Sequence, residues 1–412
     1  MPETHEEILK DARIKESQAL IGEKNVEVLK RLIEDAIDVL EETGFHCPNG
    51  RIKELLESTG LAAYDETSGQ MHILGDLSRQ VLKQVPKNES FPLPFGSFGI
   101  GGTAPYFLGE GGSLEDATEE RIEQLAKIAE QSEEVSFLGR GVKLDGANDR
   151  AIEILSSKCR KPFYCGVDSK KDLDVVERLR SAGSPIYVVW DILQSPLSLS
   201  DHMVDMFLET VDRRIPIFLA SMPMPAVTAP YSVSGLLIMA LAEFIAGLAI
   251  VQIRSEGCPV VCSSFPTMTD IKRRYSLDFG HPCHNFVNCF MSHIARLLDI
   301  PACQSGCTTN EKDLSPRAIE DAKLGYSIFK KYGAHLIRHA FGFNKDLIAF
   351  SFEKFEKARE AFASVDGSEA PELLQIEYDE EAREVIARNG SSANYMQDEH
   401  TVQKTGKGFI AP

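Results

Sequence analysis

The chain has 412 residues, and 43% of them are hydrophobic, so it is long enough to bury one large core or two smaller ones. Its formal net charge of −18, together with the lack of a long lysine or arginine run, argues against a nucleic-acid-binding surface. Nine cysteines without a CxxC pair favour reduced thiols over a disulfide framework.

Two segments bear on localisation. Residues 1–17 are charged throughout and lack the apolar core of a secretion signal. Residues 236–251 form the most apolar stretch, but Glu243 interrupts it and it is shorter than the roughly 20 residues of a membrane span. We therefore predict a cytoplasmic protein with a buried helix here and no membrane partner.

The first 90 residues predict helices, with apolar residues at helical spacing over 25–42 and a hairpin near 60–69. Residues 91–112 contain five aromatic residues and seven glycines, a composition that disfavours a helix and favours a β excursion. Its aromatic side chains either contact a ligand or pack inward in a glycine-rich hairpin. We predict an N-terminal helical cap with this excursion over 1–115.

From residue 118 onward, short apolar strands alternate with helices such as 119–131 and 316–331. After the strands near 185–191, 216–223 and 259–265, the chain is predicted to turn and enter a helix, the last of these beginning within PTMTDIK. Seven strands are evident, and the eighth lies in the glycine-rich excursion or is not recognised. The pattern predicts an α/β fold over 116–412, a TIM-type (β/α)8 barrel with a C-terminal tail. The other expected strands are 135–140, 163–166, 300–307 and 333–343.

Ligands of a TIM barrel bind at the carboxyl ends of its strands. Trp190, the one tryptophan, and Asp191 lie at such an end. An indole beside a carboxylate suits a quaternary ammonium group, which has no N–H and is held by aromatic faces. The alternative is a core tryptophan capped by a hydrogen bond.

Two further ionisable residues lie in apolar surroundings. His339 ends the strand near Phe341 and Phe343 and is suited to orient a carboxylate or accept a proton, unless it is a hydrogen-bonded core histidine. Glu243 is costly to bury unpaired, so we expect a structural, hydrogen-bonded role for it.

Histidines and cysteines are dense over 281–307, which raises the hypothesis of a zinc site. Their spacing matches no standard ligand pattern, and we predict no metal in this chain. GIGGTA at 99–104 lacks the preceding strand of a nucleotide-binding turn. The residues that raise the zinc hypothesis are His281, Cys283, His284, Cys289, His293, Cys303 and Cys307.

Several segments, in their order along the chain, resemble the trimethylamine methyltransferase (MttB) family: SPLSLS at 195–200, TDIKRRYSLDFGHP at 269–282, LDIPACQSG at 298–306 and GAHLIRHAFG at 333–342. The resemblance implies a TIM-barrel enzyme that passes a methyl group from an amine to the cobalt of a separate corrinoid protein. Family members acting on trimethylamine carry pyrrolysine near the strand that corresponds to 302–306. Here that strand has ordinary residues, so the chain is more similar to non-pyrrolysine members such as glycine betaine methyltransferase.

The resemblance implies as partners a cognate corrinoid protein and a small quaternary amine, with no cofactor bound by this chain, the methylcorrinoid being carried by the partner. We also expect a homo-oligomer. Direct attack of Co(I) on a methyl group of a quaternary nitrogen needs no general acid, so the protein has to orient and desolvate. Two alternatives stay open: a zinc-dependent methyltransferase acting on a thiol, and a non-catalytic quaternary-amine-binding relative.

The same resemblance implies a set of site residues. Trp190, Phe341 and Phe343 are expected around the cation, with Asp191 as the nearby carboxylate. His339 is expected toward the far end of the substrate. Gln304 stands where pyrrolysine lies in other members, and with His339 it completes the catalytic candidates.

Overall fold

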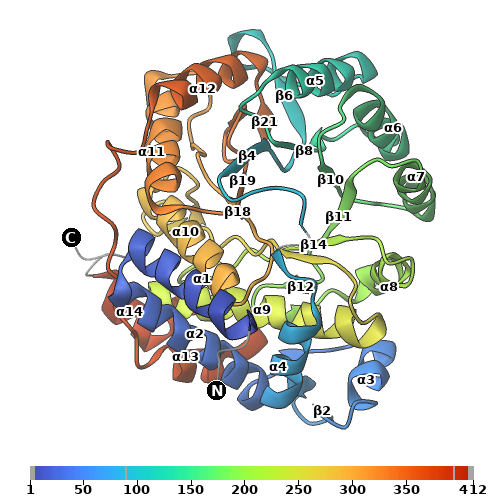
Figure 1. The fold of residues 1–412 in the computed structure, drawn as a ribbon. Coiled ribbons are helices and arrows are strands. Elements are labelled where there is room, and N and C mark those ends of the chain that lie inside the picture. Colours follow the sequence, from blue (N-terminus) through green and yellow to red (C-terminus); the bar gives the residue numbers. More distant parts are fainter. Residues whose placement is uncertain (1–4, 89–90, 393–394, 407–412) are drawn as a thin grey trace.

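Eight parallel strands form a barrel in the computed structural model, which describes residues 5–88, 91–392 and 395–406 (Figure 1). The strands follow one another around the barrel in chain order, β19 pairs with β4, and a bridge between Cys262 and Ala302 closes the ring. This confirms the TIM-type barrel and places the eighth strand in the glycine-rich segment. The strands are β4 (Ser97–Ile100), β8 (Phe137–Gly139), β10 (Phe163–Cys165), β11 (Ile186–Trp190), β14 (Ile217–Leu219), β15 (Val260–Cys262), β18 (Cys303–Ser305) and β19 (Leu336–Arg338).

A helix follows each barrel strand and lies on the outside of the ring (Figure 1). Serine or threonine side chains cap five of these helices, because the first backbone N–H groups of a helix need acceptors. The helices are α5 (Glu119–Gln131), α6 (Asn148–Lys158), α7 (Lys170–Ser181), α8 (Val204–Asp212), α9 (Val233–Arg254), α10 (Pro282–Leu297), α11 (Pro316–Tyr332) and α12 (Phe352–Ser364).

Strand alternation decides which side chains fill the barrel interior. Successive residues of a strand point to opposite faces, so alternate residues share the interior. Tyr187 and Val189 of β11 pack in the interior cluster, whereas Val188 belongs to the outer core. The buried members of the interior cluster are Phe137, Tyr164, Tyr187, Phe218, Val261, Cys303 and Leu336.

Helix α9 is apolar all round because both of its sides are covered. One side faces the barrel, and the other packs against α2 (Glu23–Glu42), α3 (Gly50–Glu57), α4 (Gly75–Gln84) and α13 (Ala382–Asn389). By length and composition α9 passes for a membrane span, but 94% of its most apolar window is buried inside the protein. As predicted, it is a buried helix.

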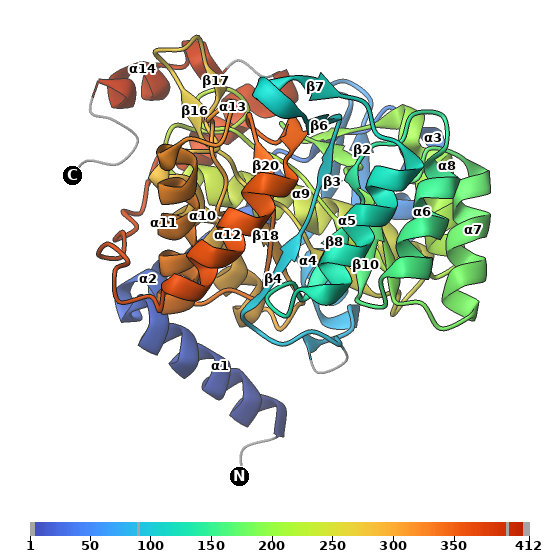
Figure 2. The same ribbon diagram turned by 90° about the horizontal axis from the view of Figure 1, so that it is seen from above.

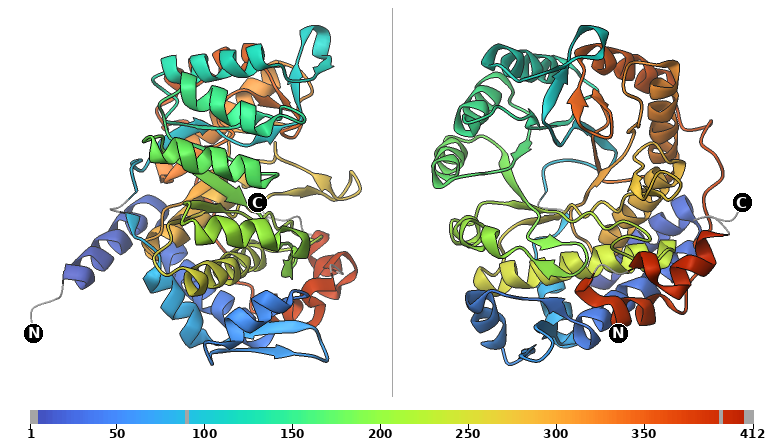
Figure 3. Two further views of the ribbon diagram at one scale, coloured as in Figure 1. Left: turned by 90° about the vertical axis from the view of Figure 1, so that its right-hand side faces the viewer. Right: turned by 180° about the vertical axis from the view of Figure 1, so that it is seen from behind.

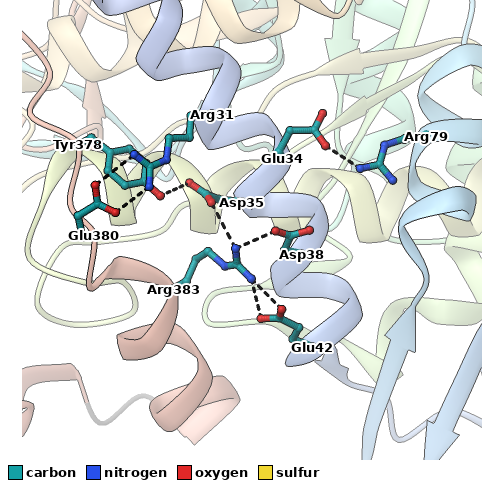
Figure 4. A network of polar contacts seen from close by, with 9 residues as sticks. All are labelled: Arg31, Glu34, Asp35, Asp38, Glu42, Arg79, Tyr378, Glu380 and Arg383. Atoms are coloured by element: carbon teal, nitrogen blue, oxygen red, sulfur yellow. Dashed lines mark hydrogen bonds and ion pairs between the residues drawn. The ribbon is translucent and has the colours of Figure 1, made fainter.

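The N-terminal region and the C-terminal tail together form the outer layer over α9. Arg383 of α13 binds Asp38 and Glu42 of α2, each at 2.8 Å (Figure 4). The Tyr378 hydroxyl donates to Asp35 at 2.8 Å, so the tail is held to α2 by several polar contacts. The layer also contains α1 (His5–Ile21) and the tail helix α14 (Glu399–Thr405). The strands β2 (Ala62–Asp65) and β3 (Gln70–Ile73) form the expected hairpin in this layer. A five-stranded sheet links β2 and β3 through β1 (Phe45–His46) to β12 (Leu193–Gln194) and β13 (Ser198–Leu199), which follow β11.

Loops after the strands build small sheets on the C-terminal side of the barrel, visible on one side of the molecule in Figures 2 and 3. The barrel takes β4 from the range expected for the cap, and the strands after β4 join these small sheets. The helix predicted within PTMTDIK is wrong: this segment enters a hairpin of β16 (Thr269–Asp270) and β17 (Ser276–Leu277), and α10 begins only at Pro282. The remaining strands are β5 (Thr103–Ala104), β6 (Tyr106–Leu108), β7 (Leu114–Glu115), β9 (Gly141–Val142), β20 (Phe343–Asn344) and β21 (Ala349–Phe350).

Candidate active site

Trp190 lies on the outer face of the barrel. Its indole Nε1 donates to Thr210 Oγ1 at 3.1 Å, and its ring packs edge-on against Phe207 at 5.9 Å, both in α8. Strand alternation explains this, because Trp190 shares the face of Val188. The contacts are those of a core tryptophan capped by a hydrogen bond. The expectation that the indole faces a cation inside the barrel does not fit these contacts.

Phe341 also turns away from the barrel axis. It is fully buried and packs against Tyr326 of α11 and against Phe355 and Phe362 of α12, at ring-centroid distances of 5.7–6.1 Å. This aromatic cluster fixes α12 on α11. Phe341 is therefore part of the outer core, and the expectation that it surrounds a bound cation does not fit its contacts.

Asp191 follows Trp190, and alternation turns it toward the barrel axis. Its side chain reaches solvent, yet enough protein surrounds it that desolvation raises the pKa of its carboxyl group to about 7. The positive charge of Arg338 acts in the opposite direction and lowers that pKa. A carboxylate both accessible and partly desolvated is suited to binding a cation.

Arg338 lies at the end of β19, with Leu336 of the interior cluster on the same face. Its Nη2 donates to the Ser263 carbonyl at 2.8 Å, and the guanidinium covers the Phe265 ring at 4.1 Å. Its Nε is buried without a hydrogen-bond partner among the described residues. In chain order β11 is the fourth strand and β19 the eighth, so Asp191 and Arg338 end strands on opposite sides of the barrel.

The glycines after β4 allow Arg338 to lie against the backbone. A Cβ on Gly101 would overlap the Cβ of Arg338 and approach the Tyr164 hydroxyl to 2.6 Å. The Tyr164 hydroxyl in turn accepts a hydrogen bond from the Gly102 N–H at 2.6 Å. The glycine-rich segment therefore contributes a barrel strand and a close backbone approach to the site.

His339 is held in place by a chain of hydrogen bonds. Its Nδ1 lies 2.8 Å from Ser305 Oγ, which lies 3.0 Å from Nε2 of His284 in α10. Burial lowers the pKa of both imidazoles, with Arg338 lowering that of His339 further, so both are neutral near pH 7. His339 has a φ of +65°, an uncommon backbone conformation that this network supports.

Phe343 packs beside His339, whereas Gln304 contacts the backbone of the neighbouring strand β15. The Phe343 ring lies 5.4 Å from the His339 ring, and Phe265 lies 6.1 Å from it on another side. Gln304 is fully buried; its Nε2 donates to the Cys262 carbonyl at 3.2 Å, and its Oε1 has no partner among the described residues.

Sequence reasoning missed Arg338, whereas it placed Phe265 at a ligand-facing strand end without including it among the site residues. The available signal for Arg338 was an arginine two residues after Leu336 in an apolar strand, a position that alternation places on the interior face. For Phe265 the signal was its position just beyond a strand end, which the sequence already indicated. The site residues chosen from the sequence were Trp190 and His339 instead.

Glu243 has the hydrogen-bonded, structural environment that we expected. Its carboxyl oxygens accept from Ser195 Oγ at 2.7 Å and from the Leu197 N–H at 3.1 Å. Burial raises its pKa to about 8, and these two hydrogen bonds limit the rise. The bonds hold the segment after β11 against α9.

The described residues contain no group of three or more histidine, cysteine or acidic side chains arranged to hold a metal ion. Burial raises the pKa values of the Cys283 and Cys303 thiols to about 12, which disfavours the thiolate form that binds zinc. His293 lies within hydrogen-bonding distance of Ser17 and of the Tyr332 carbonyl. Within this part of the chain, the zinc alternative therefore has no ligand set.

Among curated proteins, the chain is similar to the glycine betaine methyltransferase of Desulfitobacterium hafniense (strain Y51), with 21% identity over 415 residues that cover 93% of this chain and 84% of the relative. It is also similar to the proline betaine:corrinoid methyltransferase of Eubacterium limosum, with 21% identity covering 68% of this chain and 63% of the relative. The trimethylamine methyltransferase MttB of Desulfitobacterium hafniense (strain DSM 10664 / DCB-2) is 23% identical, covering 60% of this chain and 51% of the relative.

Among solved structures, the hydroxylamine complex of MtmB matches with a TM-score of 0.46 and 11% identity, covering 92% of this chain and 93% of that one. A family model described as trimethylamine methyltransferase (MTTB) matches residues 179–412, which is more than half of the chain and includes β11 and β19. On that match, the chain belongs to the trimethylamine methyltransferase (MTTB) family.

Proposed function

We propose that this protein transfers a methyl group from a zwitterionic quaternary amine, a betaine, to the Co(I) of a separate corrinoid protein. The observation that carries the proposal is the pair of opposite charges at the C-terminal end of the barrel, Asp191 after the fourth strand and Arg338 in the eighth. A betaine carries a fixed cation and a carboxylate on one small molecule. It complements both charges when it lies across the barrel.

Each end of such a substrate has a chemically suitable partner. The guanidinium of Arg338 is a fork of N–H donors that matches a carboxylate, and one of its nitrogens has no partner among the described residues. The quaternary ammonium group has no N–H to donate, so its positive charge is met by the carboxylate of Asp191 on the other side of the barrel. The Phe343 ring lies at the opposite end of the site, beside His339. Neutral His339 lies beside Arg338 as a further polar contact for the carboxylate end.

The proposed reaction requires little acid or base catalysis from these residues. When the nucleophilic cobalt of the partner takes the methyl carbon, the C–N bond breaks and nitrogen keeps the electron pair, so the departing tertiary amine is neutral. No residue has to donate a proton in this step. The work of the chain is to orient the methyl group and to exclude water.

Two relatives are named for betaines, glycine betaine and proline betaine, and both of these compounds are zwitterions. That supports a substrate with a carboxylate. Trp190 and Phe341 have no part in the proposed cation site because they pack outside the barrel. The acidic charge and the unpaired cysteines are consistent with an enzyme of the cytoplasm.

The proposal is tested by mixing the protein anaerobically with a Co(I)-corrinoid protein and matched amines, following the visible spectrum of the methylated corrinoid. Glycine betaine and carnitine carry a carboxylate; choline and tetramethylammonium are quaternary amines without one. We expect methylation with at least one carboxylate-bearing amine, at a kcat/KM well above those of choline and tetramethylammonium.

Equal kcat/KM values for choline and the betaines would refute the proposal that the substrate is a zwitterion, but not the proposed methyl transfer. Binding of a betaine in calorimetry without methylation of any active Co(I) corrinoid would instead favour a non-catalytic relative.

A further inference from the structure

A basic hairpin projects from the C-terminal side of the barrel. It comprises residues 269–277, with β16 and β17 paired in antiparallel and joined by 271–275. The consecutive side chains of Lys272, Arg273 and Arg274 at its tip are all exposed. In the left view of Figure 3, this yellow segment extends beyond the surrounding helices on the side opposite to α1.

The two arginines of the basic hairpin differ from the other arginines of the described residues. Every other one forms an ion pair or a side-chain hydrogen bond within the protein. Arg273 and Arg274 form neither there, and Lys272 likewise has no ion pair in this part of the chain. Three adjacent cations thus face solvent without a partner among the described residues, on a protein whose net charge is −18.

The acidic residues around the base of the hairpin do not neutralise its tip. Asp270 accepts from the backbone N–H of Arg273 at 3.1 Å, and Asp278 accepts from Asn310 at 2.5 Å. The charge of Arg273 acts on Asp346 only through space, lowering a pKa that burial raises to about 6. The carboxylates therefore position the base while the cations point outward.

The hairpin is anchored directly to the candidate active site. Its chain continues the loop that carries Phe265, whose N–H donates to the Ser221 carbonyl at 2.9 Å. Thr267 N–H donates to the Pro223 carbonyl at 3.1 Å, and Thr269 Oγ1 to that of Pro225 at 2.7 Å. These bonds tie the hairpin to the loop after β14, so a protein bound at the tip stands next to the site.

We propose that the basic hairpin docks an acidic surface of the corrinoid protein and so guides its cobalt to the C-terminal end of the barrel. This inference rests on the proposed function, which requires a second protein to approach that end. A strongly acidic enzyme repels an acidic partner at long range, and a local basic patch reverses the field where docking must occur. The unpaired arginines then find carboxylates on the partner.

The experiment compares Arg273→Glu/Arg274→Glu with the matched control Lys158→Glu/Arg160→Glu. The control makes the same change in net charge where α6 ends, before β10 begins. Two acceptors are used with the best amine: a Co(I)-corrinoid protein that the wild type methylates, and free cob(I)alamin. We expect the hairpin variant to raise KM for the corrinoid protein by about tenfold or more, with a weakened salt dependence.

The rate with free cob(I)alamin and the KM for the amine are expected to stay at wild-type values in both variants. An unchanged KM for the corrinoid protein in the folded hairpin variant would overturn the docking surface. A changed oligomeric state in size-exclusion chromatography, with normal transfer, would assign the hairpin to a contact between copies instead. No methylation of either acceptor by the wild type would reject the proposed function itself. Arg273→Gln/Arg274→Gln serves as the milder variant and is expected to give an intermediate KM.

Discussion

Replacing Arg338 by methionine tests how the substrate is recognised. The guanidinium donates from Nη2 to the Ser263 carbonyl, and its Nε lacks a partner in the described part of the chain. The Nε donor is thus available to a carboxylate. Two charge-assisted hydrogen bonds contribute about 2–4 kcal/mol to binding. We therefore expect kcat/KM for a betaine to fall roughly 30- to 1,000-fold.

The comparison with an amine that lacks a carboxylate isolates this effect. For tetramethylammonium or choline, the same substitution is expected to change kcat/KM by less than about threefold, because no carboxylate contact is lost. Arg338→Lys keeps the charge but loses the planar fork, so it should recover only part of the betaine activity. Equal losses for both kinds of substrate, measured by methylation of the corrinoid, would refute the assignment and leave Arg338 a structural role.

The free energy of unfolding provides the control for the variant with methionine at position 338, Arg338→Met. Methionine removes a buried charge and can still cover the Phe265 ring, and replacing buried charges by apolar side chains is often close to neutral. Urea unfolding should therefore show a change below about 2 kcal/mol. A much larger loss would mean that a fall in activity reports damage to the barrel end.

Three further substitutions test the site and its surroundings. Because the pKa of Asp191 is about 7, the betaine affinity of the wild type, measured by calorimetry, should fall by about tenfold per pH unit below 7 and level off above it. The Asp191→Asn variant should bind betaine weakly at every pH. A wild-type affinity that does not change with pH would contradict the role of the carboxylate. The folded protein raises the pKa of Glu243 from its ordinary 4.5 to about 8, so it holds a proton that the unfolded chain releases, and the free energy of unfolding should fall as pH rises from 4.5 to 8. Glu243→Gln should remove that part of the pH dependence in urea titrations, and an unchanged slope would show that Glu243 does not cause it. Trp190→Phe should lower the free energy of unfolding by about 1–3 kcal/mol, since it deletes the hydrogen bond to Thr210 and leaves a cavity, while the betaine Kd stays unchanged. Weaker betaine binding at wild-type stability would show that the indole contacts the substrate.

Much of the barrel could be predicted from local sequence. Helix 119–131 has the predicted bounds, and the seven recognised strands all lie within their expected ranges. The periodicity of buried positions and the turn residues between elements suffice for this, because they reflect local geometry. The hairpin at 269–277 was missed because its turn depends on two consecutive residues with positive φ, Arg274 and Tyr275, which are neither glycine nor asparagine.

Whether a residue at a strand end faces a ligand was decided by the tertiary structure. Trp190 and Asp191 are neighbours in sequence, and composition favours the indole as the cation-binding group. The register of β11 within a closed barrel turns Tyr187 and Val189 inward, so Trp190 points to α8 and Asp191 to the axis.

The sequence by itself determined the alternation of strands and helices, the burial of α9 and the family, since each of these rests on patterns along the chain. Only the tertiary structure decided that Arg338 stands across the barrel from Asp191 and that the cations at the tip of the hairpin have no partner in the described part of the chain. Such relations join residues far apart in sequence, through barrel closure and strand register, and no local pattern records them.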